Sequence, residues 1–329
     1  MADNLDWSTG KPAMAYVGDE PWHGLGEKLN SGATIETWIK AAGLEWQIIR
    51  EPVCYRFKDR MREVPDRQVL IRSDNGAPLS IVSDSYLIVQ PKEVIEFYRD
   101  LVDGSAFSLE TAGALDEGRK VWGLARSNKI RDNIKEDPID TFLLLASSCD
   151  KSIATTVAFT SIRVVCQNTL SFAMEEVKGK PSTKCLKISH KNQFDWTEAK
   201  KKLNLIDGAW SAFIEKVELL AARKVEQNDV DKFFEVIFLN KKKDDEKLSK
   251  KAIIEIQNLK SAYVNGPGQN LSTAKNTAWG LVNAVTYYVD HKRKRNSQGE
   301  RLDSAWFGTG ALLKDKAWDA ALEMLQEAA

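Results

Sequence analysis

A set of polar side chains recurs at four-residue spacing near the middle of the sequence. Arg163, Gln167 and Ser171 stand at positions i, i+4 and i+8, and Asn168 follows Gln167. On a helix this spacing places the three side chains on one face. Arginine and amide groups donate hydrogen bonds to phosphate oxygens and base edges, so this face is a candidate nucleic-acid-binding surface. Alternatively, Gln167 and Asn168 bond to buried backbone groups where the helix packs on a sheet.

Further cationic and aromatic residues could extend this surface. Arginine and lysine side chains on neighbouring hairpins would contact phosphates, and aromatic rings of the N-terminal strands would stack on bases. The nucleic-acid contacts predicted in addition to Arg163, Gln167 and Asn168 are Arg119, Lys120, Lys151, Tyr55, Phe57 and Tyr86. Such binding should weaken steeply with added salt, because it releases counterions from the phosphate chain.

A second hypothesis assigns the chain to the proteins that bind protein partners. Large aromatic residues anchor many protein interfaces, and several stand in or near the C-terminal part of the chain. The candidate interface residues are Trp22, Trp279, Trp306, Phe307 and Trp318. The partner would be another protein or a second copy of the chain. The alternative is ordinary packing in the core, which for Trp22 would mean a plug or lid over a sheet edge.

No pattern of residues predicts an enzyme. The sequence lacks a P-loop, HExxH and GxSxG, and its acidic residues alternate with basic ones as on solvated faces. The four cysteines, at positions 54, 149, 166 and 185, form no CxxC pair, and the three histidines are widely separated. We therefore expect no catalytic residues, no cofactor and no metal site.

Composition indicates a globular chain without a membrane-spanning segment. The 329 residues are 43% hydrophobic and 29% charged, with 47 basic and 47 acidic residues. No apolar run approaches the roughly 18 residues that a membrane span needs, and the first residues do not resemble a signal peptide. We therefore expect a cytoplasmic protein that does not enter a membrane. Residues 1–180 have a net charge of about −5 and the remainder about +5.

The elements that must position these residues centre on Thr141–Met174. Phe142–Ala146 is an apolar run and Ile153–Phe159 is rich in Val, Thr and Ile, so both predict buried strands of a hairpin with Asp150 and Lys151 at its tip. From Ile162 onward the apolar residues fall at helical spacing, which predicts a helix that carries the polar set.

Preceding segments predict short helices and hairpins. Thr34 is a candidate N-cap, Pro91 can open a helix, and Asn75-Gly76 is typical of a hairpin turn. The predicted strands are Glu45–Arg50, Val53–Phe57, Gln68–Arg72, Leu79–Val82, Tyr86–Val89, Phe107–Leu115 and Arg119–Ala125. This order predicts an α+β fold with an antiparallel, hairpin-rich sheet that carries helices on one face.

After this sheet the pattern becomes helical. Residues 178–191 are rich in Lys with Gly, Pro and Ser, which predicts an exposed loop. Helical apolar spacing then covers Trp196–Lys224, Val230–Leu239, Glu246–Val264, Thr273–Asp290 and Ala311–Glu327. We therefore expect a sheet domain over residues 1–177, a basic linker over 178–195 and a helical region over 196–329.

Several local sequences mark a known family. RVVCQNTLSFAM at 163–174, WHGLG, DSYLIVQ, TAGALDEGRKVW and SAWFGTG together resemble a family of phage and plasmid-encoded proteins of unknown function, over Trp22 to about Ala320. The expected architecture is also similar to that of the single-strand annealing proteins of phage recombination. That resemblance implies homo-oligomeric rings or filaments that hold single-stranded DNA in a groove, without cofactor chemistry, in a bacterial host cell. In that setting, the protein partner of the second hypothesis would be a host or phage protein. The acidic balance of the N-terminal half argues against it, unless a groove is locally basic.

Overall fold

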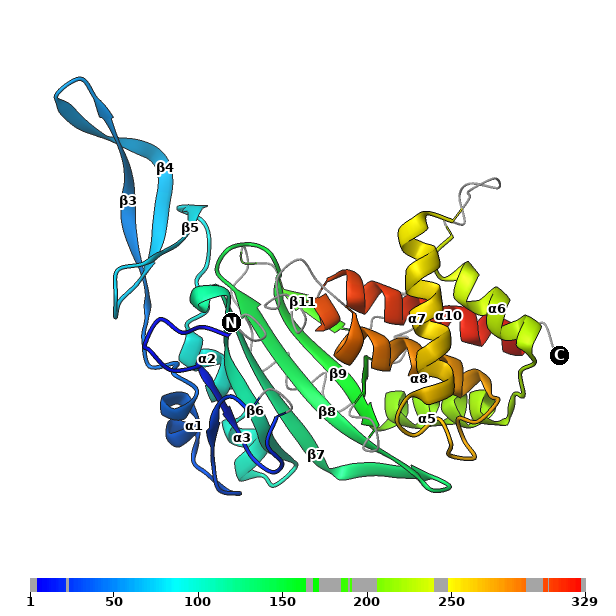
Figure 1. The fold of residues 1–329 in the computed structure, drawn as a ribbon. Coiled ribbons are helices and arrows are strands. Elements are labelled where there is room, and N and C mark those ends of the chain that lie inside the picture. The colour runs from blue at the N-terminus through cyan, green and yellow to red at the C-terminus, as the bar shows by residue number, and fades with distance from the viewer. Residues whose placement is uncertain are drawn as a thin grey trace. The chain divides into compact units, whose positions relative to one another are not determined.

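The chain divides into two compact units in the computed structural model (Figure 1). The structure describes residues 5–21, 24–163, 168–171, 185–188, 190, 206–239, 248–293, 304–306 and 308–326. Unit 1 comprises residues 1–129, 142–159 and 183–204, and unit 2 comprises residues 130–141, 160–182 and 205–329. The division thus differs from the expected boundary at residue 177. Strands and helices together confirm the α+β class. None of the helices in the described ranges is long and apolar enough to cross a membrane.

A three-stranded antiparallel sheet in unit 1 carries a long hairpin. Its order is β3 (Ile48–Phe57), β4 (Arg60–Arg72) and β5 (Pro78–Ser83). The predicted turn at Asn75-Gly76 joins β4 to β5 and is confirmed, with Gly76 at a φ of +70°. Pro52, by contrast, lies within β3, where the pairing shifts register, so the two strands predicted on either side of it are one.

β3 and β4 continue past β5 as a two-stranded ribbon (Figure 1). Pro52 lies opposite Gln68 and Cys54 opposite Glu63, so residues 64–67 stand opposite Val53 alone. This irregularity is a β-bulge, which bends a strand and increases its twist. Residues 54–63 beyond it are all exposed. We call residues 54–63 the ribbon tip.

The larger sheet has eight strands. Its order is β10-β9-β8-β7-β6-β1-β2, and β11 also pairs with β9. The strands are β1 (Met14–Tyr16), β2 (Glu27–Lys28), β6 (Phe107–Leu115), β7 (Lys120–Ile134), β8 (Asp137–Ser148), β9 (Thr155–Arg163), β10 (Asn168–Ser171) and β11 (Cys185–Ile188). β1 and β2 pair in parallel, whereas β1–β6, β6–β7, β9–β10 and β9–β11 are antiparallel. The hairpins predicted around Asp116–Gly118 (η2) and around Asp150-Lys151 are confirmed.

Three sequence predictions in this region are wrong. The helix expected from Ile162 is replaced by the end of β9 and by β10, with Asn168 opposite Arg163 in the ladder. Ile162 and Thr169 are β-branched and favour strands, and backbone pairing between β9 and β10 outweighs the helical spacing. Tyr86–Val89 is not a strand, and Cys185–Ile188 forms β11 inside the segment expected to be a loop.

Helices of unit 1 begin at the predicted residues. α1 (Ile35–Ala41) starts after Thr34, whose hydroxyl accepts a bond from the Thr37 N–H. The helix predicted from Pro91 forms as two short pieces, α2 (Pro91–Glu96) and α3 (Arg99–Asp103). Tyr98 between them is buried, and its hydroxyl is within 2.6 Å of the Gly123 carbonyl oxygen. A side chain at 123 would collide with that ring, because its Cβ would lie 2.7 Å away.

A buried arginine joins three segments of unit 1. Arg72 is fully buried, and its guanidinium forms ion pairs with Asp6 and Asp74. It also lies 4.1 Å from the centroid of the Trp46 ring. Gly118, at a φ of +90°, leaves space for it, since a Cβ there would lie 2.6 Å from the guanidinium. Burial lowers the pKa of Arg72, but hydrogen bonds to the two carboxylates raise it by more, so the group stays charged.

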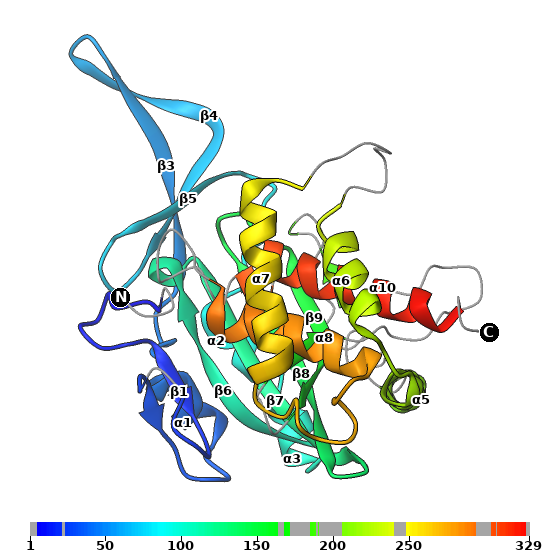
Figure 2. The ribbon, with the colours of Figure 1, turned by 45° about the vertical axis from the view of Figure 1, so that its right-hand side comes forward.

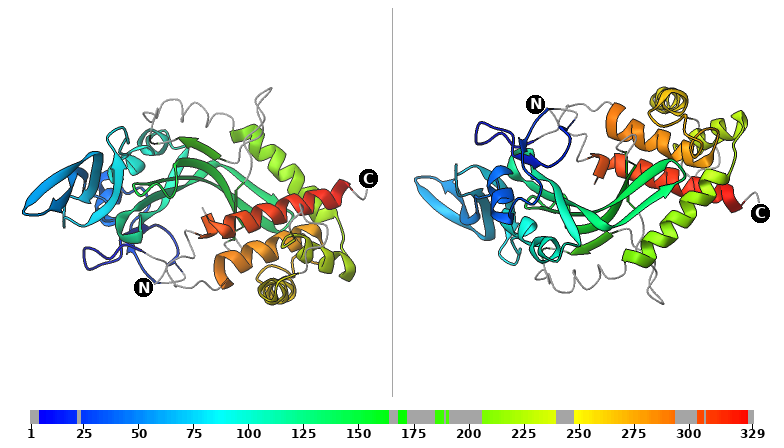
Figure 3. Two further views of the ribbon diagram at one scale, coloured as in Figure 1. Left: turned by 90° about the horizontal axis from the view of Figure 1, so that it is seen from above. Right: turned by 90° about the horizontal axis from the view of Figure 1, so that it is seen from below.

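Unit 2 is mainly helical, as predicted. Its helices are α5 (Ile206–Ala222), α6 (Gln227–Val236), α7 (Lys250–Asn265), α8 (Ala278–Tyr287), which continues into the π-helical turn η3 (Tyr288–Lys292), and α10 (Thr309–Gln326). Every residue of α8 except Tyr287 is buried. It contacts α5, α7 and α10; α7 crosses it in Figure 2, and α10 runs beside it in both views of Figure 3.

Candidate functional site

The ribbon tip gathers aromatic and cationic side chains on one face. Tyr55 lies opposite Arg62, and Phe57 lies opposite Arg60. Opposed residues of an antiparallel pair point to the same side, and so do residues two apart on one strand. Tyr55, Phe57, Arg60 and Arg62 therefore share a face, which we call the ribbon face. The two aromatic residues are exposed, at 47% and 50%.

Cations flank the Phe57 ring on this ribbon. The Arg62 guanidinium lies 5.1 Å from the ring centroid, and the Lys58 ammonium lies 5.6 Å from it. Both distances are within the range of a cation–π contact. Across the ribbon, the opposite face carries Cys54, Arg56, Met61 and Glu63. Four basic and two acidic residues occur between Cys54 and Glu63, so the tip is locally basic although the chain is neutral overall.

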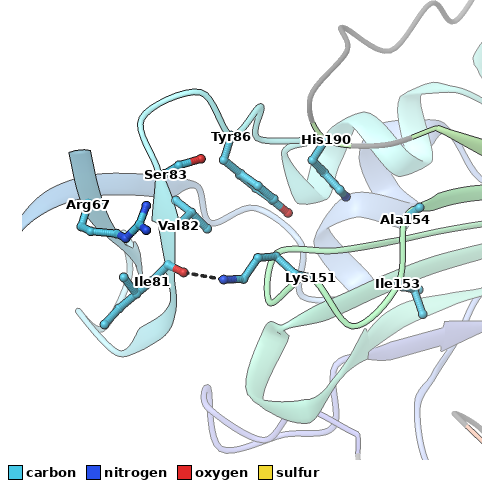
Figure 4. Close-up of a pocket in the computed structure, with 9 residues that line it drawn as sticks. All are labelled: Arg67, Ile81, Val82, Ser83, Tyr86, Lys151, Ile153, Ala154 and His190. Carbon is cyan, nitrogen blue, oxygen red and sulfur yellow. Dashed lines mark hydrogen bonds between the residues drawn. The ribbon is translucent and has the colours of Figure 1, made fainter.

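A cavity of about 650 Å³ lies in unit 1 beside β4 and β5 (Figure 4). Its lining residues come from β4, β5, the loop after β5 and the turn between β8 and β9, together with His190. They are Arg67, Ile81, Val82, Ser83, Tyr86, Lys151, Ile153, Ala154 and His190. Arg67 lies opposite Ser83 in the β4–β5 ladder, so these two side chains point to the same side.

Two cations of the cavity have no acidic partner within the described ranges. The Lys151 ammonium donates to the Ile81 carbonyl oxygen, at 2.9 Å, and Figure 4 shows the side chain extended toward β5. The Arg67 guanidinium donates to the Asp66 carbonyl oxygen at 3.2 Å. Both residues are exposed. Among the described residues, their charges are thus balanced only by backbone dipoles and solvent.

A stacked pair of rings forms another wall of the cavity. Tyr86 and His190 lie with ring centroids 4.7 Å apart and an interplanar angle of 11°. The Tyr86 hydroxyl donates to the Ser148 carbonyl oxygen at 3.0 Å, and burial raises the pKa of that hydroxyl. Nδ1 of His190 is 3.0 Å from the Leu87 carbonyl oxygen, which can only accept, so Nδ1 carries the proton.

His190 is consequently a neutral ring with an unused acceptor. Burial lowers its pKa, and this effect exceeds the opposing effect of the bond to Leu87. With the proton on Nδ1, Nε2 bears a lone pair. That nitrogen is buried and has no hydrogen-bond partner among the residues that the structure describes. An unpaired buried acceptor costs about 1–3 kcal/mol, so a donor supplied by a ligand would be favoured there.

Four of the nine predicted nucleic-acid contacts lie on the ribbon face or in the cavity. Tyr55 and Phe57 lie on the ribbon face, and Lys151 and Tyr86 meet in the cavity. The sequence predicts that Tyr86 stacks on a base. The structure shows no open ring there, because Tyr86 is only 7% exposed and packs against His190. Arg119 also differs from its predicted role. It forms ion pairs with Asp116 at 3.2 Å and Glu117 at 3.1 Å, which hold it to the turn before β7.

The remaining predicted contacts lie on strands or outside the described residues. Lys120 begins β7 and is half-buried. Arg163 and Asn168 face each other across β9 and β10, so they do not form a helical face, although they are paired in the ladder. Gln167 lies outside the described residues. The predicted group of Arg163, Gln167 and Asn168 therefore has a different geometry from the one that the spacing indicated.

Two of the predicted interface residues are buried. Trp279 and Trp318 are 3% and 7% exposed, and Trp318 stacks on Phe213 with ring centroids 5.3 Å apart. The indole N–H of Trp279 donates to the Asp137 carboxylate at 3.3 Å within unit 2. These two residues fit the alternative of ordinary packing, not exposed anchors. Trp306 is half-buried, and Trp22 and Phe307 lie outside the described residues.

Several residues of the ribbon face and of the cavity were not predicted from the sequence. Arg60 and Arg62 complete the ribbon face, while Arg67, Ser83 and His190 line the cavity. The alternation of aromatic and basic residues in YRFKDRMR, residues 55–62, was a usable signal for the ribbon. Arg67, Lys151 and His190 are far apart in sequence, so no local pattern joins them.

The described residues include no cluster of metal ligands, and the thiol next to the cavity is not reactive. No group of three or more His, Cys, Asp or Glu residues that could hold a metal ion occurs in the described part of the chain. Cys149 is buried beneath the cavity wall in a cluster with Tyr86 and Val82. Burial, with a contribution from Asp150, raises the pKa of its thiol to about 12, so it is protonated and inert at neutral pH.

Comparison with known proteins identifies a family. No curated protein and no solved structure matches the chain. A family model described as "Domain of unknown function (DUF932)" matches residues 78–306, which is more than half of the chain. The matched range includes β5, the β8–β9 turn and His190, but it begins after the ribbon tip. On this match, the protein belongs to the DUF932 family.

Proposed function

We propose that the protein binds single-stranded nucleic acid through the ribbon face, as a phage or plasmid-encoded annealing protein without catalytic activity. The observation that carries the proposal is the placement of Tyr55, Phe57, Arg60 and Arg62 on one exposed face. Stacking of a base on an aromatic ring contributes about 1–3 kcal/mol, and arginine adds phosphate contacts and cation–π contacts. The four side chains supply base stacking and phosphate contacts at the tip of one hairpin.

Exposed aromatic rings favour a single strand over a duplex. In a duplex the bases stack on one another, so their faces are not open to Tyr55 and Phe57, whereas an unpaired base can stack on any ring. Annealing also requires that two strands meet. We therefore propose a homo-oligomer that presents several ribbons, and we expect light scattering to give a mass above that of one chain.

Fluorescence anisotropy tests the ribbon proposal. We would titrate labelled oligothymidine and a labelled duplex with the wild-type protein at two salt concentrations. The double variant Tyr55→Ala, Phe57→Ala should bind the single strand at least about tenfold more weakly, because it loses two stacking surfaces. Its matched control, Cys54→Ala with Met61→Ala, alters the opposite face of the same ribbon and should keep the wild-type affinity.

Three results would contradict the proposal. The first is wild-type protein that binds neither probe at low salt. The second is equal loss in the two double variants, which would show that the ribbon face has no special role. The third is affinity that does not change with salt, because phosphate contacts release counterions. The partner-binding alternative receives no support from Trp279 or Trp318, which are buried.

A further inference from the structure

The cavity of unit 1 combines features that the ribbon proposal does not use. Lys151 and Arg67 approach it from the β8–β9 turn and from β4, and neither has an acidic partner within the described ranges (Figure 4). Two such cations at the edge of one cavity attract an anion with more than one acceptor oxygen, such as a phosphate group. The Ser83 hydroxyl, opposite Arg67 in the ladder, adds a neutral donor on the same side.

The apolar part of the lining indicates more than a bare phosphate ion. Ile81, Val82, Ile153 and Ala154 contribute hydrocarbon surface, and the volume of about 650 Å³ is that of a typical small-molecule site. A free phosphate ion would leave most of this space unfilled. A sugar or a base attached to the phosphate would cover the apolar residues.

His190 supplies the third element of recognition. Its Nε2 is a buried acceptor without a partner among the described residues, and its ring is held by the stack on Tyr86 and by the bond to Leu87. A sugar hydroxyl or a base amino group is the donor that such an acceptor requires. The cavity thus combines cations, apolar surface and one fixed acceptor.

Lys151 is also held in an uncommon backbone conformation. Its φ is +68°, in the left-handed region that glycine and asparagine adopt more readily than lysine. The turn uses lysine there nonetheless, and its ammonium reaches across to β5.

From this combination we propose that the cavity binds a nucleoside phosphomonoester, with Arg67 and Lys151 on the phosphate and His190 on the sugar or base. The ligand is either a free mononucleotide or the phosphorylated end of a nucleic-acid strand, which present the same chemical group. The proposal does not depend on the ribbon: a mononucleotide can occupy the cavity even if the ribbon binds nothing. The two proposals therefore fail independently.

Calorimetric titration with thymidine 5′-monophosphate tests the site, with thymidine as the ligand that lacks the phosphate. We expect the monophosphate to bind and thymidine to bind at least about tenfold more weakly, because it forms no charge-assisted bonds. Lys151→Gln and Arg67→Gln should each weaken binding of the monophosphate about tenfold. Lys28→Gln removes the same charge from an exposed position on β2, outside both sites, and should leave that affinity unchanged.

A localised readout guards against a general charge effect. In a methyl NMR spectrum, the signals of Ile81 and Ile153 should move on addition of the monophosphate, because both residues line the cavity. The signal of Ile253, an exposed residue of α7 in unit 2, should not move. Since Arg67 and Lys151 are exposed, their variants should fold, and thermal denaturation would verify this.

The next experiment asks whether the bound phosphate belongs to a free nucleotide or to a strand end. It uses the Tyr55→Ala, Phe57→Ala variant, in which the ribbon contributes least to binding. Tighter binding of a 5′-phosphorylated oligonucleotide than of its 5′-hydroxyl twin assigns the site to strand ends. Binding of the monophosphate without that preference assigns it to free nucleotides. The proposal is overturned if thymidine binds as tightly as its monophosphate, if inorganic phosphate competes equally well, or if Lys28→Gln has the effect of Lys151→Gln.

Discussion

Arg72 makes a buried charge network that depends on one side chain. Its guanidinium is fully buried and is the ion-pair partner of Asp6, which is only 2% exposed. Replacement by methionine keeps the volume but leaves the Asp6 carboxylate buried without its cation. We expect Arg72→Met to lower the free energy of unfolding by about 3–5 kcal/mol, as is found when one member of a buried pair is removed. Urea denaturation followed by circular dichroism measures this change.

Arg60 provides the matched control for this prediction. It is on the same strand, β4, but lies at the exposed ribbon tip. Arg60→Met should alter the free energy of unfolding by no more than about 0.5 kcal/mol. If Arg72→Met were as mild as Arg60→Met, the network around Arg72 would not stabilise unit 1 in the way that its geometry indicates.

The pKa of His190 makes stability depend on pH in a defined direction. Burial lowers this pKa below the value of 6.5 for the unfolded chain, and this effect exceeds the opposing effect of the hydrogen bond to Leu87. The contribution of the neutral ring is therefore complete above about pH 6.5. As the pH falls below that value, the unfolded chain takes up the proton first, so stability decreases until the folded-state pKa is passed.

Denaturation of His190→Phe at several pH values tests this sign. The variant should lack part of the decrease in stability that the wild-type protein shows between about pH 6.5 and the lowered folded-state pKa. Phenylalanine keeps an aromatic ring against Tyr86, so the stack is largely retained. His291→Phe, which removes a histidine from η3 in unit 2, should retain the His190 contribution. A wild-type stability that increases as the pH falls through this window, with no such increase in His190→Phe, would contradict the assignment.

Among the elements, the ribbon tip is separable from the fold. All residues from Cys54 to Glu63 are exposed, so their removal uncovers no core. We expect a variant in which Asn-Gly replaces residues 54–63 to unfold at nearly the wild-type temperature, since that dipeptide closes a hairpin by itself. The same variant should lose affinity for oligothymidine in the anisotropy titration. Retained affinity would move the binding surface to another part of the molecule.

The elements differ in how well the sequence predicts them. Helices α6 and α7 of unit 2 follow from apolar spacing, because each buries one stripe of side chains and that stripe is visible in the sequence. β4 was predicted only from Gln68, since Arg60–Arg67 is mostly charged and contains Pro65. Its strand forms because β3 pairs with it along the ribbon, an interaction that no hydrophobic pattern encodes.

The two candidate sites show the same difference. Tyr55 and Phe57 could be proposed as stacking residues because a ribbon is local, and its two strands are adjacent in sequence. The cavity could not be predicted, because Arg67, Lys151 and His190 are brought together only by tertiary structure. The polar residues around Arg163 were assigned to a helix for another reason. The spacing of their β-branched neighbours is compatible with both a helix and a strand.

For the whole molecule, net charge provides no attraction to a polyanion. Lys and Arg together equal Asp and Glu at 47 each, so any binding of nucleic acid depends on local cations. At the ribbon tip the cations are Arg56, Lys58, Arg60 and Arg62, of which Arg60 and Arg62 lie on the ribbon face. Binding through these few cations implies few phosphate contacts. The affinity should therefore depend less steeply on salt than the affinity of a protein with a basic groove.

The dependence of affinity on salt can therefore count the contacts that the ribbon makes. For a single strand, the logarithm of the binding constant falls with the logarithm of salt concentration by about 0.7 for each neutralised phosphate. Removing both arginines of the ribbon face, in Arg60→Gln with Arg62→Gln, should lower the steepness of that fall by about 1.4. Arg56→Gln, on the opposite face, should leave the slope near its wild-type value. A slope that the double variant does not change would show that the phosphates lie elsewhere on the protein, because counterion release reports every cation that contacts the strand.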